Sequence, residues 1–164
     1  MSNCISDTQG TEPMLLGGGT ASALVGVWTL AEYTDVQEGA IPVHPFGTKP
    51  EGLLIYTREG FVSAQLMKPG RPALGLDNWR HGSAESYAQI ASGYIAYCGR
   101  YAVDEAQALV VHRPIVALFP GLIARDQQRH YELSGERLIL STNHTSSDGV
   151  MTTTRLVWIR HKDS

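Results

Sequence analysis

The chain has 164 residues, of which 43% are hydrophobic and 18% charged, and its formal net charge is −3. This length suits one domain, and the interspersed charges form no basic patch, which argues against nucleic acid as a partner. No apolar stretch approaches the roughly 20 residues that cross a bilayer, and no basic start followed by an apolar run marks a secretory signal. We therefore expect a cytoplasmic protein that has no membrane partner.

The chemistry-bearing residue types form no local motif for a metal or a disulfide. Cys4 lies in a polar segment and Cys98 in an apolar run, while the six histidines show neither HxH nor HExxH spacing. No CxxC pair is present. These spacings are the local signals of a metal site, and no nucleotide or flavin motif is present either, so we expect no metal and no cofactor.

The N-terminal part of the chain predicts a tail and then a strand and a hairpin. Residues 1–22 are polar, Gly-rich and unpatterned, which predicts a flexible tail before a domain at residues 23–162. A first strand is expected at Val25–Thr34. After a Pro/Gly-rich connection, Leu53–Thr57 and Phe61–Met67 form a predicted hairpin, in whose turn Gly60 can take a positive φ.

The remainder predicts one helix and five more strands. Ser83 can cap a helix that has Glu85 in its first turn and Tyr87, Ile90, Ala91 and Tyr94 on one face. The strands expected after it are Ile95–Val103, Ala108–Val116, Ala124–Leu133, Arg137–Thr142 and Met151–His161. Eight strands close into a barrel that is filled or holds one small ligand. We predict an all-β fold, an eight-stranded antiparallel up-and-down barrel with one short helix.

The two ends of the strand region carry residues that suit barrel closure. Gly26 and Trp28 open the first strand, and Trp158 and Arg160 close the last. A glycine permits close backbone approach, an indole fills the bottom of a core, and an arginine can lie on that indole. We interpret Trp28, Trp158 and Arg160 as a structural plug and the barrel interior as the working site.

Strand alternation predicts which side chains point inward. If Trp28 points inward, Leu30 and Glu32 share its face, provided that no bulge intervenes. In the hairpin, Leu54 and Tyr56 are expected opposite Ser63 and Phe61, and Gln65 follows on the inner face.

Turn positions in the later strands predict a polar layer. They place Gly99 opposite His112 and His112 opposite Arg129, with Tyr97, Tyr101, Gln127 and Tyr131 on the same faces. Buried Glu, Arg and His are costly unless paired, so these groups should bond each other or a ligand.

Several motifs together resemble the lipocalin-like domain of compact stand-alone proteins of bacteria and fungi, over about residues 24–160. They are Gly26–Trp28, Pro50–Tyr56, Gly60–Leu66, Gly93–Tyr97, Gly99–Val103, His112, Gln127–Arg129, Gly135–Leu138 and Leu156–Trp158. The resemblance implies a barrel with a small-molecule cavity. Some lipocalin-like proteins of natural-product pathways act as cofactor-free cyclases or isomerases, which is an analogy at the level of fold.

Each candidate site residue has a functional and a structural interpretation. His112 is a general acid/base or polar anchor for ligand, or else a bonded core histidine. Arg129 binds a carboxylate or enolate oxygen, or else forms a structural ion pair with Glu32 or stacks on an aromatic ring. Substrate-binding candidates are Tyr56, Ser63, Gln65, Tyr97, Tyr101, Gln127 and, on a loop that can cover the mouth, Trp79.

The sequence leaves three classes of function open. The preferred hypothesis is a cofactor-independent isomerase or cyclase of secondary metabolism, in which Arg129 and a tyrosine polarise a carbonyl and His112 or Glu32 carries the proton. The alternative is a carrier or binding protein for a hydrophobic small molecule. A third class, an interaction module, would have a filled core. A small molecule is the expected partner, and a homodimer stays open.

Overall fold

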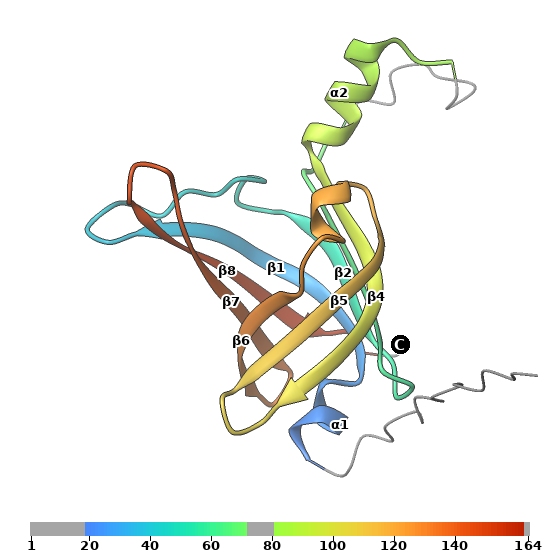
Figure 1. Cartoon of the computed structure of the whole chain (residues 1–164), viewed down its shortest axis with the longest axis vertical. Helices are drawn as coiled ribbons and strands as arrows, with labels where there is room; N and C mark the ends of the chain where they lie inside the picture. Colours follow the sequence, from blue (N-terminus) through green and yellow to red (C-terminus); the bar gives the residue numbers. More distant parts are fainter. Residues whose placement is uncertain (1–18, 72–80, 163–164) are drawn as a thin grey trace, which may run out of the picture.

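Each strand pairs with the next in antiparallel fashion and β8 pairs with β1, so that the sheet closes into one barrel (Figure 1). A computed structural model describes residues 19–71 and 81–162. The strands are β1 Gly26–Gln37, β2 Glu51–Tyr56, β3 Phe61–Met67, β4 Tyr94–Asp104, β5 Leu109–Ala117, β6 Gln127–Ser134, β7 Arg137–Thr145 and β8 Met151–Arg160. The predicted fold class is confirmed.

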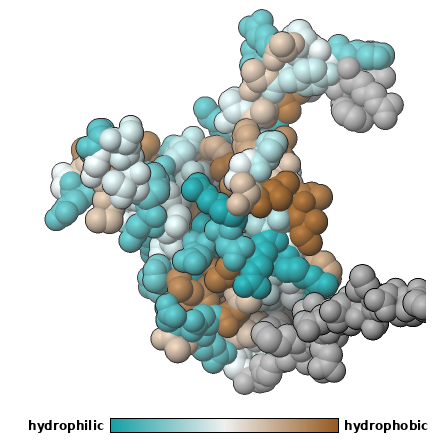
Figure 2. Space-filling model, viewed as in Figure 1, coloured by the Kyte–Doolittle hydropathy of each residue, from teal (hydrophilic) through white to brown (hydrophobic). Residues whose placement is uncertain are grey.

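Within the described residues, three short helical segments accompany the barrel: α1 Thr20–Leu24, α2 Ala84–Ser92 and the 3₁₀ turn η1 Pro120–Leu122. The predicted helix is α2, where the Ser83 hydroxyl accepts a hydrogen bond from the Ser86 backbone N–H at 3.1 Å. Tyr94, expected on its apolar face, instead begins β4. Figure 1 and the space-filling view of Figure 2 show α2 standing away from the barrel, and none of its residues is buried.

Of the predicted flexible tail, residues 1–22, the structure describes only residues 19–22. Residues 1–18 lie outside the described residues, and Thr20–Ser22 form the start of α1. Ala21 and Leu24 of that helix are buried against the barrel. Among the helices of the described residues, none is long and apolar enough to cross a membrane.

The floor of the barrel joins the first strand to the last. The indole Nε1 of Trp28 donates to the Leu24 carbonyl at 2.8 Å, and the Arg160 guanidinium lies 4.0 Å from the centre of the Trp28 ring. Gly26 has a φ of +138°, a backbone conformation that favours glycine, and a Cβ there would also come within 2.6 Å of Arg160 Nη1 and displace the guanidinium. The predicted plug is confirmed in its Trp28 and Arg160 parts.

The β2–β3 hairpin differs from the predicted register by one residue. Leu54 pairs with Ala64 and Tyr56 with Val62. The reason is the length of the turn: Arg58, Glu59 and Gly60 lie between Thr57 and Phe61, and the Thr57 backbone N–H donates to the Phe61 carbonyl at 2.9 Å. A shift of one residue exchanges the faces of a strand. The prediction that Ser63 and Gln65 face the lumen is therefore wrong; Ala64 and its neighbours at two-residue spacing do so.

A bulge in β1 reverses the predicted orientation of Glu32. Leu30 pairs with Trp158 but Glu32 pairs with Val157, so that Ala31 is the extra residue. Glu32 consequently lies outside the barrel, where its carboxylate meets Arg155 at 3.8 Å and its side chain is 43% exposed. Tyr33 and Asp35 take the inward positions beyond the bulge.

The registers of β4, β5 and β6 differ from prediction by two residues. His112 pairs with Tyr101 and Gln127, whereas Gly99 pairs with Pro114 and Arg129 with Val110. The four-residue turn after Asp104 is closed by Ala108, which takes a left-handed φ of 51° where no glycine marks the position. Because a shift of two keeps the face, His112, Arg129 and Tyr97 still point inward.

Candidate functional site

A cavity of about 210 Å³ occupies the upper part of the barrel interior. Its wall is mostly aliphatic and aromatic, with polar groups from β1, β4, β5, β6, β7 and β8. The lining residues are Tyr33, Leu54, Ala64, Leu66, Ile95, Tyr97, His112, Leu122, Arg129, Leu140, Thr142, Thr154, Leu156 and Trp158. The lumen is therefore hollow, which contradicts the filled core that an interaction module would have.

His112 is the centre of a buried hydrogen-bond chain. The Tyr56 hydroxyl lies 2.7 Å from its Nε2, and the Tyr97 hydroxyl lies 2.8 Å from its Nδ1. The imidazole is 1% exposed, Tyr56 is 1% exposed and Tyr97 is 7% exposed. The three residues come from β2, β4 and β5, so closure of the barrel is what brings them together.

Burial sets the protonation of this chain. Removal from water, assisted by the nearby positive charge of Arg129, lowers the pKa of His112 to about 3. Burial raises the pKa of Tyr56 well above its ordinary value and also raises that of Tyr97. At neutral pH the imidazole and both phenols are therefore uncharged, and His112 has almost no capacity to take up a proton.

Arg129 stands at the edge of the cavity. Its guanidinium donates to the Gln128 carbonyl at 2.8 Å and to the Gln127 side-chain oxygen at 3.4 Å. Within residues 19–71 and 81–162, no carboxylate lies at ion-pair distance from it, so the predicted pairing with Glu32 is wrong. Arg129 and Thr142 also line an open hollow between β6 and β7, so the cavity adjoins the surface there.

Two of the expected ligand contacts are committed to the protein. The Gln127 side-chain amide donates to the carbonyls of Leu122 and Arg125, which fixes η1 against β6. The Tyr101 hydroxyl donates to the Thr57 carbonyl at 3.0 Å, and burial together with Glu59 raises its pKa to about 12. Neither side chain lines the cavity.

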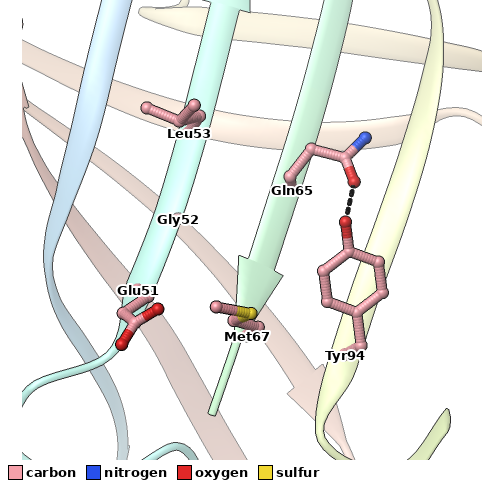
Figure 3. Close-up of a pocket in the computed structure, with 6 residues that line it drawn as sticks. All are labelled: Glu51, Gly52, Leu53, Gln65, Met67 and Tyr94. Carbon is pink, nitrogen blue, oxygen red and sulfur yellow. Dashed lines mark hydrogen bonds between the residues drawn. The ribbon is translucent and has the colours of Figure 1, made fainter. Parts of the chain in front are cut away.

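Gln65 belongs to a shallow hollow on the outer face of the barrel, shown in Figure 3. Its side-chain oxygen accepts a hydrogen bond from the Tyr94 hydroxyl, and Glu51, Gly52, Leu53 and Met67 complete the hollow. Ser63 lies on the same outer face as Gln65, and the Gln65 amide is 3.5 Å from its hydroxyl. Trp79 lies outside the described residues.

Sequence reasoning missed part of the site. Tyr33, Thr154 and Thr142 line the cavity, and Asp35 sits beside it, where it accepts a hydrogen bond from Thr154 at 2.6 Å. Trp158, interpreted above as part of the plug, also lines the cavity. The inward direction of Thr154 could have been predicted from the strict alternation of β8, which places it on the same face as Trp158. The inward direction of Tyr33 and Asp35 could not, because the bulge in β1 breaks the alternation before them.

The arrangement suits the binding of a molecule smaller than a drug, since pockets for drug-sized ligands begin at about 300 Å³. The described residues contain no group of three or more His, Cys, Asp or Glu side chains that could hold a metal ion. A closed eight-stranded barrel with an internal cavity of this kind defines a class of small-molecule-binding proteins.

The chain belongs to the lipocalin-like domain family, whose sequence model matches residues 25–161. It is also similar to the 4'-hydroxy-3'-methoxypropiophenone carrier protein ppsC of Aspergillus oryzae (strain ATCC 42149 / RIB 40). The two are 32% identical over 89 residues, which cover 51% of this chain and 80% of that protein.

Proposed function

We propose that this protein binds and carries a small, partly apolar molecule, such as a substituted aromatic ketone, inside the barrel without changing it chemically. The observation that carries the proposal is the 210 Å³ cavity, whose apolar walls converge on the Tyr97–His112 pair and Arg129 at its polar side. Apolar walls supply affinity and a few fixed polar groups supply orientation. The similarity to a protein named as a carrier of an aryl ketone supports the same class.

Binding is favoured over catalysis because the two expected proton carriers, His112 and Glu32, are unsuited to that role. His112 has a pKa of about 3, far from the neutral value that an efficient general base needs. Glu32 faces solvent on the outside of the barrel. A cofactor-free isomerase or cyclase remains the second candidate, because Tyr97 and Arg129 at one end of the cavity are suited to polarise a carbonyl.

One titration separates the candidates. The purified protein is titrated with 4'-hydroxy-3'-methoxypropiophenone while the intrinsic tryptophan fluorescence is followed, to which Trp158 in the cavity wall contributes. A saturable change with the ketone recovered intact supports a carrier. Recovery of an isomer of equal mass overturns the carrier proposal in favour of catalysis.

A filled-cavity variant controls the titration. Ala64 lines the cavity and its side chain is buried, so a larger side chain there should remove binding if the ligand sits in the lumen. Binding that survives unchanged would place the ligand elsewhere, for instance in the outer hollow at Gln65.

A further inference from the structure

We propose that the Tyr97 hydroxyl hydrogen is held free for the cavity, so that the bound molecule must place an acceptor oxygen, of the carbonyl type, against Tyr97 beside Arg129. This inference rests on the proposed binding function and deepens it, because it assigns the ligand's polar end. It follows from counting hydrogens along the Tyr56–His112–Tyr97 chain.

A neutral imidazole has one nitrogen that carries a hydrogen and one that carries a lone pair. His112 is uncharged, since burial lowers its pKa to about 3. Both of its nitrogens are occupied by tyrosine hydroxyls, at 2.7 Å for Tyr56 and 2.8 Å for Tyr97. One tyrosine therefore donates to the ring, and the other accepts from it and keeps its own hydrogen for a further partner.

The surroundings decide which tyrosine donates. Tyr56 is 1% exposed and does not line the cavity, and within the described part of the chain its hydroxyl has His112 as its sole hydrogen-bond partner. If Tyr56 accepted from His112, its own hydrogen would be buried without an acceptor, which is unfavourable. Tyr56 therefore donates to Nε2, and the hydrogen of His112 sits on Nδ1.

Nδ1 then donates to the Tyr97 oxygen, and the Tyr97 hydrogen is left over. Tyr97 lines the cavity, and no second partner for its hydroxyl exists among residues 19–71 and 81–162. Burial raises the pKa of this phenol, so the hydrogen is retained at neutral pH. The side chain thus presents a donor to whatever occupies the lumen.

Other groups of the cavity wall point to the same ligand chemistry. The buried indole N–H of Trp158, a side chain that lines the cavity, has no hydrogen-bond partner in the described structure. Arg129 contributes a guanidinium that no carboxylate neutralises in the described residues. Because Tyr97, Trp158 and Arg129 all present donors on the cavity wall, a ligand with an acceptor oxygen is favoured over a pure hydrocarbon.

The first experiment reads the hydrogen position without any ligand. Long-range ¹H–¹⁵N correlation spectra of the full chain, labelled at histidine, distinguish the two neutral tautomers. We expect His112 as the Nδ1–H form. The Nε2–H form would overturn the inference whatever the protein binds, so this result is independent of the proposed function.

The second experiment tests the ligand's polar end. The probes are 4'-hydroxy-3'-methoxypropiophenone and its analogue with a methylene group in place of the carbonyl. We expect the ketone to bind the native protein about five- to tenfold more tightly than the analogue, and this ratio to fall to about two in Tyr97→Phe, where Arg129 still faces the carbonyl. A ratio that persists in Tyr97→Phe, or one already near unity in the native protein, overturns the inference.

Discussion

The guanidinium of Arg160, at the end of β8, lies 4.0 Å from the centre of the Trp28 ring in β1 and donates to the carbonyls of Ala23 and Val25. This contact joins the last strand to the first, and it ties α1 to the barrel floor. It lies at the end of the barrel opposite the polar cavity and has a structural role.

Replacement of Arg160 by Ala should lower the free energy of unfolding by about 2 kcal/mol, since a partly desolvated cation–π contact and two hydrogen bonds are lost. Urea denaturation measures the effect. Arg137→Ala is the control, because Arg137 is exposed and has no recorded side-chain partner in the described structure. Equal stability of the two variants would contradict the structural role.

The buried neutral His112 should make stability depend on pH. Unfolded His112 titrates near 6.5, whereas in the folded protein its pKa is about 3. Between these values the unfolded chain binds one more proton, so the free energy of unfolding decreases by about 1.4 kcal/mol for each unit by which the pH is lowered. Above pH 6.5 the residue contributes no slope.

The comparison for this prediction is His112→Gln, which cannot titrate. Denaturation at several pH values should give a smaller slope for the variant than for the native protein below pH 6.5. Parallel curves would mean that His112 is not held neutral.

Neighbouring substitutions in β3 should separate the lumen from the outer face. Ala64→Leu adds volume to the cavity wall and should weaken ligand binding at least about tenfold, whereas Gln65→Leu alters the outer hollow and should leave affinity within about twofold. Isothermal titration with the aryl ketone measures both. The opposite ranking would restore the register first expected for this hairpin.

Two arginines provide a matched pair across the barrel wall. Arg129→Gln removes from the cavity edge a guanidinium that no carboxylate of the described residues neutralises, and should weaken binding of an acceptor ligand about tenfold. Arg155→Gln removes only the outer pair with Glu32, which is partly exposed, and should change stability by less than about 1 kcal/mol and binding hardly at all. Similar binding losses in the two variants would disprove the assignment of Arg129 to the site.

Strand alternation and turn residues were enough to predict the barrel, because each strand must bury one face and eight such strands close on themselves. They also predicted the contact of Arg160 with Trp28 and the inward direction of His112, Arg129 and Tyr97. Registers wrong by two residues did no harm to these assignments, since the side-chain period is two.

Hydrogen bonding between strands, which sequence does not encode locally, fixed the rest. The extra residue at Ala31 turned Glu32 outward and brought Tyr33 and Asp35 inward. The three-residue turn that ends at Gly60 placed Ala64, and not Gln65, at the lumen. The low pKa of His112, which prevents it from carrying protons at neutral pH, was likewise decided by the tertiary structure. Burial between Tyr56 and Tyr97 lowers this pKa, and the residue type alone does not reveal how far a side chain is removed from water.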